Sequence, residues 1–340
     1  MDANTNPTEP ISEAIPSTMQ AIAHTRFGTP AEALVPTDAP TPEIGPDEVL
    51  IRVAAVGVAI GDWLIVSGLP YIARPMFGIR TPKKAIAGQQ LAGTVVALGE
   101  AVNRFAIGDE VYGWAPGAMA EYAVAPQDTV AHAPSSVTPA EAATVPISAV
   151  TALQAVRDHG KVTDGTSVLV VGASGGVGSF AVQIAKALGG EVTGVASTDS
   201  VDFLRSIGAD HVIDYRTTAV ADAGRRFDVI IDIAGNTSIR DLRSVLADDG
   251  RLVIVGGSGG RLTMGFGRTV RAIALGRFVR QTLTTFIVDN TSDDLEAVAS
   301  MIDAGDVTPT IEQSYPLPEA AAAVELVASR HVKGATVVTV

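Results

Sequence analysis

The fold is decided by residues 167–189, which read SVLVVGASGGVGSFAVQIAKALG. After Ser167, the run VLVV is uniformly apolar, as expected for a strand that is buried on both faces of a sheet. The stretch 177–188 places apolar residues at helical spacing. Between them, Gly172, Gly175 and Gly178 recur at every third position, so the chain can turn sharply without a side chain in the way. The sequence therefore predicts a strand, a tight glycine turn and a helix.

The same alternation continues on the C-terminal side of this unit. Solidly apolar strands separated by helices are typical of a parallel, doubly wound sheet in an α/β protein. We expect such a sheet to form one domain. Its further predicted elements are strands at 191–197, 211–215, 227–234 and 251–255, and helices at 201–207 and 239–246.

The two flanking parts of the chain have a different pattern. Before the glycine turn, short β-like runs are broken by Gly and Pro, which predicts a β-rich domain. After the α/β part, the chain returns to mixed structure, and we expect the two flanking parts to form one domain. Their predicted elements are strands at 48–56, 91–98, 109–113, 311–316 and 335–340, and helices at 138–157, 293–304 and 318–329.

Composition limits the partners and the chemistry. The 340 residues suggest two domains, and 24 Lys and Arg against 37 Asp and Glu give a formal net charge of −13. This acidic balance argues against nucleic acid and against an anionic membrane surface as partners. The absence of Cys excludes disulfides, thiolate metal sites and a Cys nucleophile. Residues 1–18 lack the features of a signal peptide and predict a flexible tail, so we expect a cytoplasmic protein.

The glycine turn has the features of a site for a diphosphate. Gly175 and Gly176 would let an anion approach the backbone closely, and Gly178 would let the helix pack against the strand. Free N–H groups at the start of the helix would bind the phosphates, helped by the helix dipole. We therefore expect a nucleotide site, even in an acidic protein, because the attraction is local.

An alternative interpretation uses the same residues. Residues 172–176 also match the G-x-S-x-G nucleophile elbow of serine hydrolases, with Ser174 as nucleophile and His211 or His331 as base. The pattern recurs at 256–260, which shows how permissive it is. No oxyanion loop of the His-Gly-Gly type lies upstream. The nucleotide interpretation is therefore favoured.

The choice of nucleotide is made at the end of the second strand. An acidic residue there selects NAD, whereas small polar or basic residues admit the 2′-phosphate of NADP. The hydroxyls of Ser197 and Thr198 suit a phosphate, and Asp199 would oppose it unless it points away as a helix cap. The sequence favours NADPH, with NADH as the alternative.

Further segments follow the order of a known family. They are GDEVYG (108–113), GAMAEYA (117–123), EAATVPISAVTALQA (141–155), LRSIGADHVIDY (204–215), DVIIDIAGN (228–236) and GRLVIVGG (250–257). With the glycine turn, they make the chain from about residue 20 to 340 resemble the zinc-independent medium-chain dehydrogenase/reductases, in the quinone oxidoreductase and enoyl reductase branch. The resemblance implies a GroES-like catalytic domain at 19–150 and 285–340, a Rossmann NAD(P)-binding domain at 151–284, and a homodimer.

The resemblance also implies the residues of the cofactor site. Thr151 matches the family threonine that approaches the nicotinamide, and Phe286, Ile287 and Val288 fall in the segment that usually covers it. The remaining cofactor-binding residues implied by the family are Gly172, Ser174, Gly175, Gly176, Val177 and Gly178 at the diphosphate, Ser197, Thr198 and Tyr215 at the adenosine end, and Ala234, Val255, Gly256 and Gly257 toward the nicotinamide.

The sequence departs from the family at three places. Where the zinc-dependent branch has Cys and Gly-His-Glu, this chain has Ala59 and 88–90 (Gly-Gln-Gln), so we expect no metal. Leu64 stands where quinone reductases often carry Tyr, and Gly334-Ala335 replaces the usual Gly-Lys. The last two departures leave the proton donor and the substrate open.

The expected chemistry is hydride transfer without a metal. A conjugated enone or a quinone is easier to reduce in this way than an isolated ketone, which benefits from a Lewis acid. Tyr71, Asp62, Gln90 and Thr151 are the candidate catalytic residues. Tyr71 is more simply a rim residue, while Asp62 could equally be a helix cap and Gln90 an internal hydrogen-bond partner. The partner would be a small enone, quinone or carbonyl compound.

Two other functions stay open within the same resemblance. One is a nucleotide-binding regulatory or structural relative with little catalysis, and the other is a zinc-free NAD(P)-dependent alcohol dehydrogenase. The basic, amphipathic stretch 268–280 could meet the cofactor, a partner or a membrane, and we expect it to be a lid or packing helix near the active site.

Overall fold

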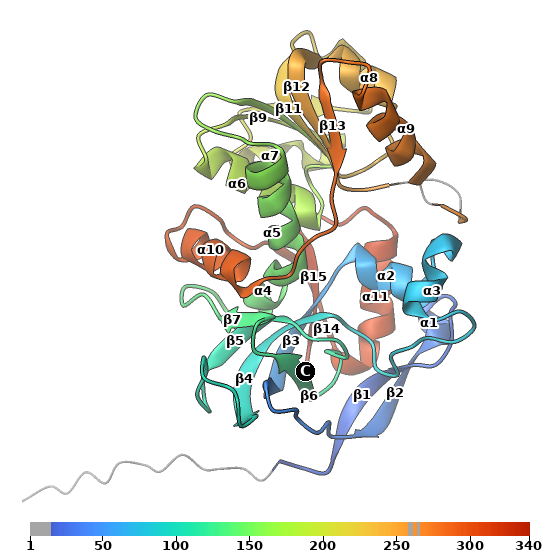
Figure 1. Cartoon of the computed structure of the whole chain (residues 1–340), viewed down its shortest axis with the longest axis vertical. Coiled ribbons are helices and arrows are strands. Elements are labelled where there is room, and N and C mark those ends of the chain that lie inside the picture. The colour runs from blue at the N-terminus through green and yellow to red at the C-terminus, as the bar shows by residue number, and fades with distance from the viewer. Residues whose placement is uncertain (1–14, 258–260, 264–265) are drawn as a thin grey trace, which may run out of the picture.

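The computed structural model describes residues 15–257, 261–263 and 266–340. Their strands form a six-stranded sheet, a seven-stranded sheet and a two-stranded sheet. Figure 1 shows the six-stranded sheet in the upper half of the molecule and the seven-stranded sheet in the lower half, with helix α5 (Val145–Leu153) between them.

The six-stranded sheet is parallel throughout and has the order β10-β9-β8-β11-β12-β13. This is the order of a Rossmann domain, in which the direction of winding reverses between β8 and β11 and ligands bind at the carboxyl ends of the strands. The predicted doubly wound α/β fold is therefore confirmed. The strands are β8 (Ser167–Val171), β9 (Glu191–Ala196), β10 (His211–Asp214), β11 (Phe227–Asp232), β12 (Leu246–Ile254) and β13 (Thr282–Thr285).

Both faces of this sheet are covered by helices. Alternate residues of a strand point to opposite faces, so β8 contributes to two separate cores. Val168 and Val170 of β8 belong to the core shared with α5 and α6. Leu169 and Val171 belong to a second core, shared with α8 and α9. Burial on both faces explains why residues 168–171 of β8 are apolar without interruption.

The seven-stranded sheet combines strands from the parts of the chain before and after the Rossmann domain. Its order is β14-β15-β3-β4-β5-β7, and β6 pairs with β3. The last strand, β15, runs antiparallel to β3, so the C-terminal residues complete the N-terminal sheet as expected. The strands are β3 (Glu48–Val58), β4 (Gln90–Leu98), β5 (Glu110–Trp114), β6 (Tyr122–Pro126), β7 (Val130–His132), β14 (Ile311–Pro316) and β15 (Ala335–Thr339).

The N-terminal segment is tied to this half of the molecule. Strands β1 (Thr18–His24) and β2 (Leu34–Pro40) form the two-stranded antiparallel sheet. Strand β1 thus begins at the last residue of the predicted tail, and residues 1–14 of that tail lie outside the described residues.

The helices follow the predicted order, with one correction. A single helix over 138–157 was expected, but the structure breaks it into α4, α5 and a π-helical segment, η2. Pro146 lacks the N–H group that a continuous helix needs and would clash with the preceding turn, so the chain restarts at Val145. Strand β13, with the sequence TLTT, was missed because it carries no apolar pattern.

The helices have these bounds: α1 (Pro30–Ala33), α2 (Ile60–Ser67), α3 (Arg74–Phe77), α4 (Pro139–Ala143), α5 (Val145–Leu153), α6 (Gly176–Ala187), α7 (Val201–Ser206), α8 (Ile239–Ser244), α9 (Phe266–Gly276), α10 (Ser292–Asp303) and α11 (Ala320–Ala328). Shorter segments are η1 (Tyr71–Ala73), η2 (Gln154–His159), η3 (Thr198–Ser200), η4 (Val220–Asp222) and η5 (Leu317–Glu319). No helix within the described ranges is both long and apolar enough to cross a membrane.

The two domains are joined where the candidate site lies. The N–H of Gly334, just before β15, donates to the carbonyl oxygen of Ser174 in the glycine turn (2.8 Å). On the other side, the N–H of Tyr71 donates to the carbonyl oxygen of Arg261 (3.1 Å). We refer to this region, between the seven-stranded sheet and the carboxyl ends of β8, β11 and β12, as the domain junction.

Candidate functional site

The glycine turn follows β8 at the domain junction, and its geometry requires glycine at two positions. Gly172 has a φ of +85°, and a Cβ atom there would lie 3.0 Å from the Cβ of Ala234. A Cβ atom at Gly178 would lie 2.1 Å from the carbonyl oxygen of Gly172. The close packing of helix on strand that the sequence predicted for Gly178 is therefore confirmed.

The start of α6 leaves donors free for an anion. The N-cap residue Gly175 provides no side-chain cap. Among the hydrogen bonds of the described residues, the N–H groups of Gly176, Val177 and Gly178 have no acceptor. A Cβ at Gly175 would meet nothing closer than 3.9 Å, so the outer side of the turn is open. An uncapped helix start beside open space fits the diphosphate of a dinucleotide.

The end of β9 carries the residues that choose between nucleotides. Thr198 donates its hydroxyl to Asp214 at the end of β10 (2.5 Å). This hydrogen bond, and a second one from the N–H of Arg216, lower the pKa of Asp214. Ser197 is the N-cap of η3, and the neighbouring Tyr215 is 52% exposed.

Asp199 does not act as a helix cap, which was one of its two predicted roles. The caps of η3 and α7 are Ser197 and Ser200. The Asp199 carboxylate instead pairs with the Arg216 guanidinium at 3.0 Å. The sequence analysis missed Arg216, although a basic residue directly after Tyr215, at the end of the third parallel strand, could have drawn attention to it.

The residues expected along the cofactor fall into two groups. Ala234 follows β11 and lies against Gly172, while residues 255–257 follow β12 and lie against 233–235. Together with the glycine turn, Ala234 and residues 255–257 therefore form one row at the carboxyl ends of β8, β11 and β12.

The segment that was expected to cover the nicotinamide is held by contacts with the end of helix α5 and with η2. The ring of Phe286 stacks on His159 at the end of η2 (4.4 Å between centroids), and Val288 packs in the same core. Ile287 is 95% exposed. The backbone of Asp289 exchanges two hydrogen bonds with the side chain of Gln154. The segment is thus anchored along helix α5–η2.

The structure does not bring together the residues of the serine hydrolase interpretation. His211 lies at the first residue of β10, and its ring contacts Glu191 at the first residue of β9. Ser174 follows the last residue of β8, so it lies at the opposite edge of the parallel sheet. Within the described part of the chain, no hydrogen bond joins Ser174 to His211 or His331.

Gln90 and Thr151 come together at the start of α5. The side-chain oxygen of Gln90 accepts from the N–H of Ile147 (2.7 Å), and the hydroxyl of Thr151 donates to the carbonyl of Ile147 (2.6 Å). Both residues are buried. The next residue, Ser148, has its hydroxyl oxygen 3.3 Å from where a Cβ of Gly176 would lie. The start of α5 thus links Gln90 to the glycine turn.

Asp62 is a buried helix-start residue. It is 3% exposed in α2, where it accepts from the N–H of Ala59 (2.8 Å) and from the side-chain amide of Gln89 (3.4 Å). Burial raises the pKa of Asp62 to about 6, and these hydrogen bonds oppose the rise only in part. The carboxylate of Asp62, in the first turn of α2, therefore caps the start of this helix, which is one of the roles that the sequence left open.

We expect Asp62→Asn to remove a pH dependence of stability. Because folding raises the pKa of Asp62 from its usual 3.8 to about 6, its contribution to stability is fully present below 3.8 and is lost as the pH rises through about 6. At about 1.4 kcal/mol per pKa unit, the loss approaches 3 kcal/mol. The amide oxygen of asparagine would still accept from Ala59 but would not ionise. Urea unfolding of both proteins across this pH range measures the difference, and parallel pH profiles would contradict the assignment.

Tyr71 lies at the other side of the domain junction. It is 42% exposed, and the guanidinium of Arg74 lies 4.7 Å from its ring centroid. Its hydroxyl has no hydrogen bond to any other described residue. Leu64, in α2, occupies the position where quinone reductases often have Tyr. Tyr71 is thus brought to the junction, and no hydrogen bond between described residues joins its side chain to Gln90 or Thr151.

The side chains at the junction do not fit a zinc ion. The positions of the zinc ligands are taken by Ala59 and by the amides of Gln89 and Gln90, and Asp62 is already held by hydrogen bonds. Zinc sites need three or four His, Cys or carboxylate ligands. No group of three or more such residues gathers within the described part of the chain.

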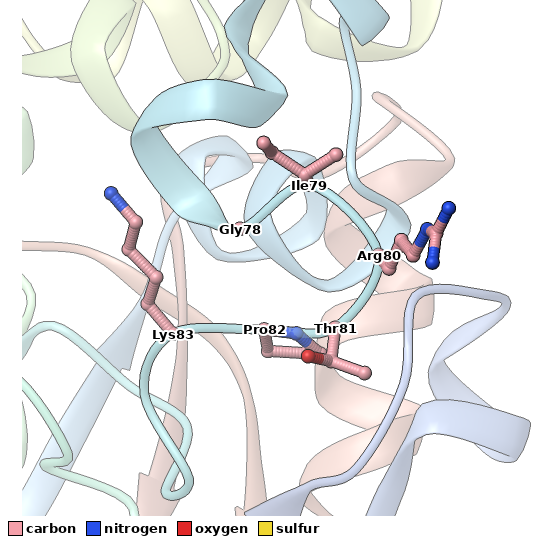
Figure 2. Close-up of a pocket in the computed structure, with 6 residues that line it drawn as sticks. All are labelled: Gly78, Ile79, Arg80, Thr81, Pro82 and Lys83. Atoms are coloured by element: carbon pink, nitrogen blue, oxygen red, sulfur yellow. The ribbon is translucent and has the colours of Figure 1, made fainter.

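An open surface pocket lies away from these residues, along the loop 78–83. Figure 2 shows that six consecutive residues form it and that the side chains of Arg80 and Lys83 point outward from the ring. The loop is closed by the N–H of Lys83, which donates to the carbonyl of Phe77 (2.8 Å). None of the predicted site residues lines it.

Comparisons with known proteins agree with this architecture. The alcohol dehydrogenase GroES-like domain matches residues 45–135, and the zinc-binding dehydrogenase family matches residues 207–338. The chain is 33% identical to the quinone oxidoreductase of Sus scrofa over 94% of this chain and 96% of that protein. It is 32% identical to the mitochondrial NAD(P)H oxidoreductase RTN4IP1 of Mus musculus, over 87% and 82%. The structure of the quinone oxidoreductase from Coxiella burnetii superposes with a TM-score of 0.84 at 28% identity, covering 95% of this chain and 99% of that one.

A GroES-like domain, a Rossmann domain and an open glycine turn between them define a nicotinamide-dependent oxidoreductase. Within this class, the chain belongs to the medium-chain dehydrogenase/reductase superfamily, in its quinone oxidoreductase family. The resemblance seen in the sequence is thereby confirmed.

Proposed function

We propose that the chain is an NADPH-dependent reductase that transfers hydride to a quinone or a conjugated C=C bond without zinc. The proposal depends on the uncapped start of α6 at the domain junction. The side chains at the same junction, Gln89, Gln90 and Asp62, do not make up a set of zinc ligands. The quinone oxidoreductase relatives support the same substrate class.

The nucleotide would be held by residues of this chain at both ends. The free N–H groups of 176–178 would bind the diphosphate. Ser197, Thr198 and Arg216 would bind the 2′-phosphate, since Arg216 already neutralises Asp199. The row formed by Ala234 and 255–257 would lie along the nicotinamide half. The nicotinamide supplies the hydride.

We assign the role of hydrogen-bond donor to the substrate oxygen to Gln90. Its side-chain oxygen is held by the N–H of Ile147, which fixes the orientation of the amide. Its NH₂ group has no acceptor among the described residues. Charge that spreads onto the distant oxygen of an enone or quinone would be stabilised by such a donor. Thr151 would orient the same region through Ile147.

We expect Gln90→Glu to lower kcat by about tenfold, because the carboxylate keeps the contact with Ile147 but cannot donate. Tyr71→Phe is the comparison variant, and we expect it to change kcat little because no hydrogen bond between described residues joins Tyr71 to Gln90. Steady-state turnover of a quinone measures both. The opposite ranking would make Tyr71 the donor and would contradict the assignment of Gln90.

The function itself is tested by NADPH oxidation. Protein treated with a chelator is mixed with NADPH or NADH and with a panel of quinones and enones, and the absorbance of the reduced nucleotide is followed. We expect turnover that prefers NADPH and survives the chelator. Tight binding without turnover on the whole panel would favour the regulatory relative, and turnover of simple alcohols would favour the zinc-free alcohol dehydrogenase. The homodimer and the cytoplasmic location stay predictions, and the first is tested by light scattering.

A further inference from the structure

A second pocket lies outside the domain junction, between helices α8 and α9. Its volume is about 380 Å³, within the range of roughly 300–1,000 Å³ that is usual for small-molecule sites. In Figure 1 the two helices lie at the outer end of the six-stranded sheet, beside β13. Its lining combines arginines with apolar side chains: Arg240, Arg243, Arg268, Arg271, Ile239, Ala272, Leu275, together with Ser238. We call it the α8–α9 pocket.

The charge of this pocket is opposite to that of the whole chain. The chain carries a formal net charge of −13, yet four arginines and no acidic residue line the pocket. Arg268 is balanced by a buried ion pair with Asp232. Arg240, Arg243 and Arg271 have no ion pair within the described ranges. Three uncompensated guanidinium groups in one pocket repel one another, and a bound anion would offset that repulsion.

The arginines also have more donors than the protein supplies acceptors. A guanidinium offers five N–H donors. The Nε and Nη1 atoms of Arg268 are buried and have no acceptor, while its Nη2 donates to the carbonyl of Thr237 (2.6 Å). Arg243 is fixed by the side chain of Gln281, which accepts from its Nε at 2.7 Å. These contacts fix Arg243 and Arg268, and they leave the exposed guanidinium groups of Arg240 and Arg271 as the donors for a ligand.

The walls of the pocket are apolar. Ile239 of α8 and Ala272 and Leu275 of α9 contribute aliphatic surface next to the guanidinium groups. An inorganic anion would gain nothing from such walls, and a neutral hydrocarbon would gain nothing from three positive charges. We propose that the α8–α9 pocket binds an amphiphilic anion, a carboxylate or phosphate monoester on a single alkyl chain. Its site is separate from the glycine turn, with which it shares no residue.

The test is calorimetric titration of the full chain with decanoate, decyl phosphate, decanol and inorganic phosphate, with and without saturating NADPH. We expect decanoate or decyl phosphate to bind with NADPH present, since the glycine turn is then occupied. Decanol and inorganic phosphate should bind more weakly, because each keeps only half of the recognition. Comparing decanoate with decyl phosphate identifies the preferred head group.

Two double variants remove the same charge at different places. Arg240→Gln with Arg271→Gln takes two exposed arginines from the pocket, and we expect the alkyl anion to bind at least about tenfold more weakly. Arg277→Gln with Arg280→Gln removes two exposed arginines that do not line the pocket, and binding should change little. Thermal unfolding checks that both variants fold.

Four results would overturn the proposal: no binding of either alkyl anion, equal binding of decanol, equal binding of inorganic phosphate, or equal loss in both double variants. Each is independent of whether the chain reduces a quinone. A result against anion binding in the α8–α9 pocket therefore leaves the proposed reductase function unaffected. A result against the reductase function likewise leaves the pocket proposal unaffected.

Discussion

Gly175→Ala is expected to abolish most nucleotide binding while leaving the fold intact. A Cβ at this position meets no protein atom closer than 3.9 Å, and the backbone there is extended with a φ of −80°, so the folded chain accepts a methyl group. The same methyl group would stand in the open space before the free N–H groups of 176–178. Losing one or two charge-assisted hydrogen bonds to the diphosphate would weaken binding about a hundredfold.

Gly178→Ala is the matched comparison for that result. Here the Cβ would lie 2.1 Å from the carbonyl oxygen of Gly172, so the helix must move away from the strand. We expect this variant to lose about 1–3 kcal/mol of stability as well as nucleotide affinity. Thermal unfolding and nucleotide titration separate the two. Unchanged NADPH affinity in Gly175→Ala would contradict the assignment of the turn to the diphosphate.

Arg216→Ala is expected to reduce the affinity for NADPH about a hundredfold and to leave that for NADH nearly unchanged. Two effects add. The variant loses the positive charge that would face the 2′-phosphate, and it also frees the carboxylate of Asp199, which Arg216 holds at 3.0 Å. The released carboxylate would repel the phosphate and could accept from a ribose hydroxyl instead.

Arg226→Ala controls for the loss of one exposed positive charge. Arg226 is an exposed arginine whose ion pair, with Asp248, lies elsewhere on the same domain. Fluorescence titration with NADPH and with NADH gives the ratio of the two affinities for the unchanged protein, Arg216→Ala and Arg226→Ala. An equal loss for NADPH and NADH in Arg216→Ala would show that Arg216 does not contact the 2′-phosphate.

The Rossmann half of the fold could be predicted because its information is local. The strand at 167–171 matched to the residue, since burial on both faces requires an uninterrupted apolar run. The glycine spacing likewise reports a contact between Gly172 and Gly178 that no other residue permits. The broken helix at 138–157 shows the limit of periodicity, because Pro146 interrupts the hydrogen bonding without changing the apolar spacing.

The positions of the site residues depend on contacts between residues far apart in the chain, and the sequence does not show these contacts. The side chain of Gln90 meets Ile147, and Asp199 meets Arg216, only after strands have paired. The possible cap role of Asp62 was the exception, because its contact with Ala59 is local and spans three residues. Phe286 was placed by family resemblance, and its stack on His159 joins residues far apart in the chain.

The central claim is that hydride passes from NADPH to a carbon atom of a conjugated acceptor without a metal. The most direct measurement uses chelator-treated protein, NADPH with deuterium at both C4 positions of the nicotinamide, and a conjugated enone, with the product analysed by mass spectrometry and NMR. We predict a saturated ketone that carries one deuterium at the β carbon. A product without deuterium, an alcohol with its C=C bond intact, or activity that returns only when zinc is added would contradict the account.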